Sequence, residues 1–199
     1  MKQVEFVRRL AQVEHTRSRN GITVYIDEVH FYADADLRKL WAYKGQPTLV
    51  LSSSPGRKKV SLYGATAPAL ADFFLWEVDT FNGPHTAQFL HQVRARYPRR
   101  RIDLVFDGGP QHQGPIVEEA FGMTRMHPQK LPGYSPELNA IEPLWRWFRE
   151  EVTYNYCHAN TQFLRQDLLE TERAFNKRPA EIQKRLQPDL SKILHLLNP

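Results

Sequence analysis

Residues 102–109, Ile-Asp-Leu-Val-Phe-Asp-Gly-Gly, contain the pattern that decides the fold. Ile102 to Phe106 is apolar except for Asp103, as expected for a central strand that is buried on both faces. The run ends at Asp107, after which two glycines turn the chain. A second short apolar run, Ile22–Ile26, ends in the same way at Asp27. We therefore predict two buried strands, each followed directly by an aspartate.

Helical periodicity and turn residues place the other elements around these strands. We predict helices over residues 2–17, 86–97, 115–121, 139–154 and 161–176, and two short helices within 179–198. We predict further strands over 48–51, 59–63, 73–78 and 124–127, with a hairpin turn at 52–56 between the first two. This order of elements predicts an α/β domain with a mixed sheet flanked by helices.

The helix predicted over 139–154 has a third acidic residue near its start. Asn139 fits the N-cap, and Glu142 follows it by three positions, as in a capping box. Glu142 shares one stripe of this helix with Arg146 and Arg149. The neighbouring stripe is apolar and consists of Ile141, Trp145, Phe148 and Val152. We therefore expect this helix to bury one face and to carry a carboxylate beside it.

Asp27, Asp107 and Glu142 suit a metal-dependent reaction on phosphodiesters. Mg²⁺ prefers carboxylate oxygens, and two ions about 3.5–4 Å apart neutralise charge on both the attacking and the leaving oxygen. The ends of adjacent strands hold such side chains at a defined separation. Each carboxylate by itself also fits a structural role, because the two aspartates could serve turns and Glu142 could cap its own helix. The residues alone leave both interpretations open.

Composition narrows the class of partner and excludes several other chemistries. The net charge of +5 and the pI of about 9.4 favour a polyanionic partner. One cysteine, Cys157, excludes an internal disulfide and a zinc ribbon. The sequence has no phosphate-binding Gly-Lys loop, no zinc-protease motif and no nucleophile elbow. No apolar run is long enough to cross a membrane, so we expect no membrane partner. We also expect no small-molecule cofactor.

Five segments match the pattern of one known family. They are Val24–Glu28, Trp41–Pro47, Val60–Ala65, Leu104–Asp107 and the highly specific string Leu131-Pro132-Gly133-Tyr134-Ser135-Pro136-Glu137-Leu138-Asn139-Ala140-Ile141-Glu142-Pro143-Leu144-Trp145. The 34 residues 108–141 between Asp107 and Glu142 match the spacing of that family. On these segments, residues 20 to 155 resemble the DDE transposases of the mariner superfamily, and most closely the bacterial insertion sequence family 630.

The resemblance implies an RNase H-like fold and a transposase catalytic domain that cuts and joins DNA strands at insertion-sequence ends. It implies that Asp27, Asp107 and Glu142 hold two Mg²⁺ or Mn²⁺ ions. His112 is a minor candidate, because it matches a histidine that often follows the second aspartate. The implied partners are transposon ends, target DNA and a second copy of the chain. The implied location is the bacterial cytoplasm, in association with the nucleoid.

The resemblance also implies a division of the chain. We expect an N-terminal helix and linker over residues 1–20, a catalytic domain over 21–160, and a helical extension of that domain over 161–199. DNA contacts are expected from basic and aromatic residues in loops and beside Glu142. These residues are Arg57, Lys58, Lys59, Trp41, Tyr134, Arg146 and Arg149, and further basic residues at 94, 96 and 99–101 could extend a phosphate track.

Two departures from the family pattern matter. Gly108 stands where the family usually has asparagine, which removes a polar side chain near the metal ligands. The family's N-terminal helix-turn-helix region is missing, so we expect binding through phosphates without strong selection of an end sequence. Two alternatives remain: another RNase H-like nuclease that uses the same carboxylates, and a catalytically silent or domesticated DNA-binding module.

Overall fold

A computed structural model describes residues 2–16, 19–46, 49–50 and 58–186, and the statements below concern these residues. The strands are β1 (Gly21–Tyr32), β2 (Lys59–Ala67), β3 (Asp72–Val78), β4 (Arg101–Phe106) and β5 (His127–Lys130). The helices are α1 (Lys2–Thr16), α2 (Gly83–Arg96), α3 (Pro115–Thr124), α4 (Glu142–Val152), α5 (Thr161–Asn176) and α6 (Pro179–Leu186). No helix in these ranges is long and apolar enough to cross a membrane.

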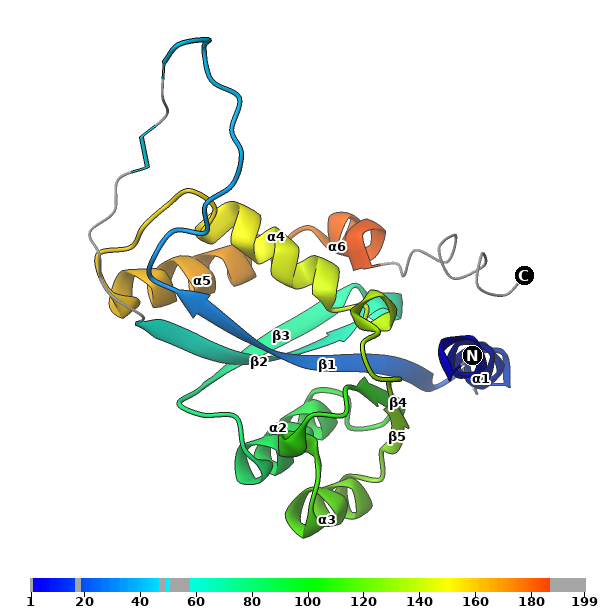
Figure 1. Cartoon of the computed structure of the whole chain (residues 1–199). Coiled ribbons are helices and arrows are strands. Elements are labelled where there is room, and N and C mark those ends of the chain that lie inside the picture. The colour runs from blue at the N-terminus through cyan, green and yellow to red at the C-terminus, as the bar shows by residue number, and fades with distance from the viewer. Residues whose placement is uncertain (1, 17–18, 47–48, 51–57, 187–199) are drawn as a thin grey trace.

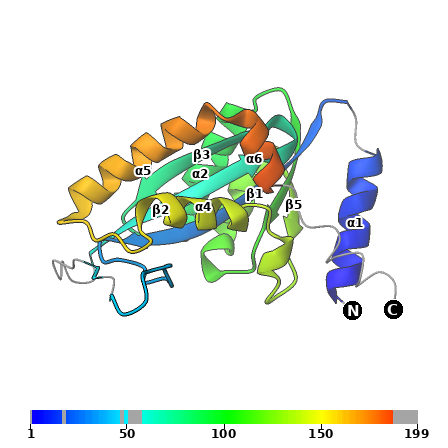
Figure 2. The ribbon, with the colours of Figure 1, turned by 90° about the horizontal axis from the view of Figure 1, so that it is seen from above.

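The five strands form one mixed sheet in the order β3-β2-β1-β4-β5. Helices α4, α5 and α6 cover one face of the sheet, and α2 and α3 cover the other (Figure 1). Helix α1 stands at the side of the sheet near β5 (Figure 2). Alternate residues of each strand point to opposite faces, so two separate apolar cores form. Tyr25 and Val29 of β1 pack in the core under α4, whereas Val24 and Ile26 pack in the core over α2.

The register between β1 and β4 brings the two predicted aspartates to the same level. These strands pair in parallel from Gly21 opposite Arg101 to Tyr25 opposite Val105. Asp27 and Asp107 each lie two residues beyond that last pair. Since parallel strands rise by nearly equal steps, the two carboxylates lie on neighbouring strands at one height.

Several predicted strand boundaries are wrong. Strand β1 does not end at Asp27 but continues to Tyr32, because residues 27–32 pair antiparallel with β2. Leu49 and Val50, the described part of the strand predicted over 48–51, are not in a strand, and β2 pairs with β1 and β3 instead. The turn predicted over 52–56 lies outside the described residues. The strand predicted over 124–127 is β5, which starts at the last of these positions because α3 extends to Thr124.

The predicted cap of α4 is also wrong. The helix begins at Glu142, after a turn of 3-10 helix over residues 136–138, and Asn139 lies before it in an extended conformation. The buried Asn139 side chain instead accepts from the backbone N–H of Ile141 at 3.4 Å and donates to the carbonyl of Ile26 at 3.5 Å. Asn139 therefore ties the loop before α4 to β1. The predicted apolar stripe of α4 is confirmed, since its four residues are all buried.

The segment that follows β1 leaves the body of the protein as an extended arm (Figure 1). Its base is held by backbone hydrogen bonds from Asp36 to Thr153 and from Asn155 back to Asp36, both near 3 Å. Residues 37–46, beyond this base, form no strand or helix. Their exposed apolar side chains are Leu37, Leu40, Trp41 and Tyr43. The fold thus exposes apolar side chains far from either core.

Helix α4 packs closely on the sheet because β2 has a glycine beneath it. A Cβ atom on Gly64 would overlap the indole ring of Trp145 and would lie 2.9 Å from Cδ1 of Ile141. Gly64 is the cross-strand partner of Asp27. The absence of a side chain at this position therefore lets the Trp145 ring reach across β2 toward Asp27.

We expect Gly64→Ala to destabilise the protein by about 1–3 kcal/mol, the usual cost of overpacking a core. The matched control is Gly122→Ala in α3, where a Cβ atom would meet nothing within 4 Å. That change should be neutral or slightly stabilising, because alanine favours helix over glycine. Urea unfolding of both variants measures the difference. Equal midpoints for the two would contradict this account of the contact between α4 and β2.

Candidate active site

Asp27 and Glu28 are neighbours in sequence but point to opposite faces of the sheet. Asp27 shares a face with Tyr25 and Val29, under α4, and Glu28 shares the other face with Ile26. The two carboxylates therefore have different surroundings. Asp27 meets a tryptophan of α4, and Glu28 meets a histidine from the segment after β4.

Asp27 is largely buried and lacks a cationic partner among the described residues. The indole N–H of Trp145 donates to its Oδ2 at 3.1 Å. Burial, followed by the negative charges of Glu28 and Glu142, raises the pKa of Asp27 to about 7, and the Trp145 hydrogen bond opposes this rise only in part. A carboxylate with a raised pKa among other carboxylates favours the binding of a cation, because a cation would remove the repulsion.

Asp107 is held from one side at the end of β4. Its Oδ1 accepts from the backbone N–H of Gly109 and contacts Nδ1 of His112, each at 2.9 Å. These contacts, with the His112 bond the strongest influence, lower the pKa of Asp107, and the charge of Lys130 adds to the effect. Oδ2 of Asp107 accepts no hydrogen bond from the described part of the chain. One oxygen is thus fixed and the other is available to a ligand.

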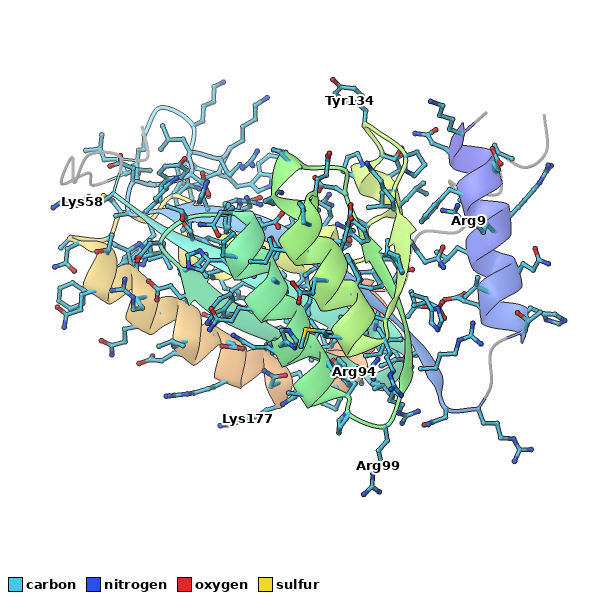
Figure 3. The ribbon with its side chains drawn as sticks, turned by 90° about the horizontal axis from the view of Figure 1, so that it is seen from below. Arg9, Lys58, Arg94, Arg99, Tyr134 and Lys177 are labelled. Carbon is cyan, nitrogen blue, oxygen red and sulfur yellow. The ribbon has the colours of Figure 1, made fainter. Side chains whose placement is uncertain are left out.

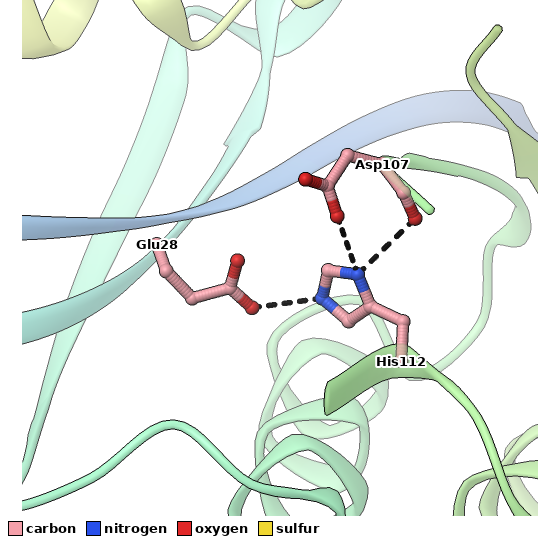
Figure 4. A group of neighbouring side chains, drawn as sticks. All are labelled: Glu28, Asp107 and His112. Carbon is pink, nitrogen blue, oxygen red and sulfur yellow. Dashed lines mark hydrogen bonds and ion pairs between the residues drawn. The ribbon is translucent and has the colours of Figure 1, made fainter. Parts of the chain in front are cut away.

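His112 connects Asp107 to Glu28 in a buried chain of ionic contacts (Figure 4). Its Nε2 lies 2.8 Å from Oε1 of Glu28, and Oε2 of Glu28 accepts from the side-chain amide of Gln111 at 3.0 Å. Burial opposes the charged imidazolium, yet the two carboxylates overcome it and raise the pKa of His112 to about 9. His112 is therefore charged at neutral pH, with a carboxylate on each side.

Glu28, Asp107 and His112 each offer a donor atom, and the three atoms lie within 4.8 Å of one another. The same three groups could ligate a cation if His112 lost one proton and became a neutral imidazole. In the chain described here both ring nitrogens already face carboxylates. A protonated imidazole has no free lone pair for a metal, so this arrangement serves better as a support for Asp107.

Asp27, Asp107 and Glu142 line one cleft of about 520 Å³. The other wall is the loop over residues 131–136, which the sequence string before α4 encodes, together with Asn139. Glu142 is half-buried, and its burial raises its pKa, while the charges of Arg149 and Arg146 lower it. The three predicted carboxylates are thus brought together, from two strands and the first turn of a helix.

The cleft fits divalent metal ions by the chemistry of its donors. All three carboxylates offer oxygen ligands, which Mg²⁺ and Mn²⁺ accept. Burial, with the charges of Glu28 and Glu142, raises the pKa of Asp27, and a bound cation would favour its charged form. An exposed cleft also leaves room for the water ligands that Mg²⁺ retains.

The residues predicted to contact DNA fall into two groups. Tyr134 lines the cleft with a fully exposed side chain and a left-handed backbone, φ 55°. Arg146 is exposed one turn beyond Glu142, whereas Arg149 stacks over Phe31 and lies 4.0 Å from Asp36. Trp41 on the arm, and Lys58 and Lys59 at the start of β2, do not line the cleft, and Figure 3 shows Lys58 far from Tyr134. Arg57 lies outside the described residues.

The basic residues of 94–101 do not extend a track to the cleft. Figure 3 shows Arg94 and Arg99 at the edge of the molecule opposite Tyr134. Arg94 donates to four backbone carbonyls, among them those of Thr124 and Arg100. Arg96 forms a 2.6 Å ion pair with Asp72. Arg94 and Arg96 therefore hold α2 to its neighbours.

Sequence reasoning did not single out Glu28, Gln111, Trp145 or Gly64 as parts of the site. The sequence placed Trp145 in the apolar stripe of α4, and it is indeed buried, but its indole N–H also donates a hydrogen bond to Asp27. Glu28 follows the first aspartate directly, and the alternation of side chains along a strand could have indicated that it faces the opposite layer. Its pairing with His112 depends on the turn after β4, which no local pattern specifies.

Comparisons with known proteins agree with this geometry. A family profile described as DDE superfamily endonuclease matches residues 23–165. The Mos1 transposase paired-end complex with left transposon end has a TM-score of 0.66 at 18% identity, covering 93% of this chain and 59% of that chain. The catalytic domain of Mos1 mariner transposase has a TM-score of 0.60 at 14% identity, covering 93% of this chain and 90% of that chain. No curated protein matches the sequence.

The solved structures and the family profile support different conclusions. At such identities the solved structures show the fold alone, and the expected RNase H-like fold is confirmed. The chain spans 59% of the length of the transposase in the paired-end complex, and 60% of it in the complex described as containing Mg. The family profile covers most of the sequence, including Asp27, Asp107 and Glu142. The chain belongs to the DDE superfamily of endonucleases.

Proposed function

We propose that the chain is the catalytic domain of a transposase of the mariner superfamily, of the kind found in the bacterial insertion sequence family 630. It would cut DNA at the ends of an insertion sequence and join the cut ends to target DNA. The observation that carries the proposal is the meeting of Asp27, Asp107 and Glu142 in one cleft. A catalytically silent module would have no need to keep Asp27 and Glu142 close enough to repel each other in a cleft that Asp107 also lines.

The three carboxylates would hold two Mg²⁺ or Mn²⁺ ions. When bound, such ions neutralise charge on the attacking and leaving oxygens of a phosphodiester. Trp145 orients Asp27 through its indole N–H. His112 and the N–H of Gly109 hold one oxygen of Asp107. We infer that these contacts keep the carboxylates aligned before DNA arrives, which lowers the cost of assembling the reactive geometry.

The surface around the cleft supports DNA as the substrate. Tyr134 lines the cleft with an exposed side chain suited to base or sugar stacking. Arg146, exposed one turn of α4 beyond Glu142, is suited to phosphate contact. Lys58, Lys59 and Trp41 would meet DNA farther away. The net charge of +5 favours this polyanionic partner and an association with the bacterial nucleoid in the cytoplasm.

If the three carboxylates hold metal ions, cleavage of DNA should depend on the metal. The chain should nick supercoiled plasmid in Mn²⁺ or Mg²⁺, and Asp27→Asn, Asp107→Asn and Glu142→Gln should each abolish nicking, because each removes a metal ligand. Saturating Mn²⁺ at about 100 times Kd should also stabilise the wild-type fold by about 2.7 kcal/mol, a shift that the three variants lose. Gel analysis and thermal melting measure the two effects.

The matched control is Asp79→Asn, an exposed carboxylate that follows β3. It should nick and bind Mn²⁺ like the wild type. Joining of a labelled 3′-hydroxyl end to the plasmid separates a strand transferase from a nuclease. If the wild type neither nicks DNA nor gains stability from Mn²⁺, the proposed function is wrong.

Glu28 should affect metal binding through His112, which holds Asp107. Glu28→Gln removes the negative charge that faces Nε2 of His112, so Asp107 should be held less firmly. We expect about a 10- to 100-fold loss of activity or metal affinity, as for other residues that orient a ligand. A titration of nicking against Mn²⁺ should show a higher half-maximal concentration. Glu119→Gln on the exposed side of α3 is the control, and equal titrations for both variants would refute the role.

The chain should associate with a second copy of itself through the exposed arm. An exposed cluster of apolar side chains, such as Leu40 and Trp41 on the arm, marks a surface suited to association. We expect sedimentation to show a dimer without DNA, and Leu40→Ser with Trp41→Ser to shift it to monomer. The control pair is Ile116→Ser with Met123→Ser, exposed residues of α3. A wild type that stays monomeric would disprove self-association, and a dimer in both double variants would place the interface elsewhere.

A further inference from the structure

Gly108 leaves a space beside Asp107 that a lysine occupies. A Cβ atom on Gly108 would lie 2.8 Å from Cε and 3.3 Å from Nζ of Lys130. Lys130 is the last residue of β5, and its cross-strand partner is Phe106, the residue before Asp107. The lysine stem therefore crosses the turn that follows the second aspartate, and it can do so because position 108 has no side chain.

The ammonium group of Lys130 acts on Asp107 through its charge but forms no direct ion pair or hydrogen bond with the described residues. No carboxylate lies within ion-pair distance of it, and no hydrogen bond forms from it. Three arginines of the described residues are used differently: Arg94 binds backbone carbonyls, and Arg96 and Arg165 pair with acidic side chains. Lys130 is thus an unpaired positive charge next to the proposed metal ligands.

Lys130 lies outside the cleft, next to the rim that Asp107 and Gly108 form. Asp107 and Gly108 line the cleft of about 520 Å³ on one side and a hollow of about 200 Å³ on the other. Lys130 lines the second hollow, with Pro128 and Gln113. A DNA strand that places a phosphodiester at Asp107 would bring a neighbouring phosphate past this rim.

We propose that Lys130 binds a phosphate of the DNA substrate next to the reacting phosphodiester, and that Gly108 is required because it lets the lysine reach this place. This proposal rests on the proposed function, since it takes DNA to be the substrate. A lysine ammonium suits the task, because it is a compact charge that binds phosphate without demanding a fixed geometry. The competing role is that of an edge-strand lysine, which only discourages pairing with other strands.

The two roles differ in how DNA binding depends on salt. A lysine that contacts a phosphate displaces a counterion, so Lys130→Ala should lower the slope of log K against log [KCl] by about 0.7–0.9 and weaken binding on every sequence alike. Lys130→Arg should keep the slope. Gly108→Ala, which pushes the lysine aside, should weaken binding in the same direction. The measurement is fluorescence anisotropy of a short labelled duplex, over a range of KCl, with Ca²⁺ at one fixed concentration.

Lys177→Ala is the matched control, since Lys177 is exposed at the end of α5 on the side opposite Tyr134 (Figure 3). It should leave affinity and slope unchanged. If Lys130→Ala binds with the wild-type slope and affinity, the proposal is overturned, and the edge-strand role stands. Nicking by the wild type is measured separately. A wild type that nicks DNA while Lys130→Ala binds normally refutes the role of Lys130 alone. A wild type that binds DNA through Lys130 but neither nicks it nor gains stability from Mn²⁺ refutes the proposed function alone.

Discussion

The parallel pairing of β1 with β4, with Tyr25 opposite Val105, is the constraint on which the candidate site depends. It sets Asp27 and Asp107 at one height on neighbouring strands, because each lies two residues past that pair. From there the strands take different courses. Strand β1 continues along β2 to Tyr32, whereas β4 ends and the chain turns at Gly108. The parting of the two strands opens the cleft into which α4 brings Glu142.

Each aspartate is supported from a different layer of the protein. On the α4 side, Gly64 makes room for Trp145, whose N–H reaches Asp27. On the α2 and α3 side, Glu28 and His112 form the buried chain that holds Asp107. The sheet between them fixes the distance between the two supports. A rigid sheet with one support on each face suits a site whose groups repel one another until a cation binds.

The loop before α4 is tied to the sheet, whereas Tyr134 in that loop and the arm after β1 are exposed. Asn139 ties the loop before α4 to the carbonyl of Ile26, which keeps that wall of the cleft in place. Tyr134, in the same loop, is fully exposed. The described part of the arm is held near its base, by Asp36 and by the Arg38 N–H, which donates to Asn155, and it carries apolar side chains into solvent. These exposed groups are the surfaces that the proposed contacts with DNA and with a second chain would use.

The sequence by itself determined the fold class and the three carboxylates that share the cleft. Mostly apolar segments ending at Asp27 and Asp107 reflect burial on both faces of a sheet, and the Pro-Gly-Tyr-Ser-Pro string with Glu142 carried the family resemblance. Such features are local, so they can be read without the fold. The continuation of β1 past Asp27, the pairing of Glu28 with His112, and the place of Lys130 over Gly108 were decided only by the tertiary structure. The physical reason is that each depends on contacts between segments distant in sequence, whose register and packing no local pattern specifies.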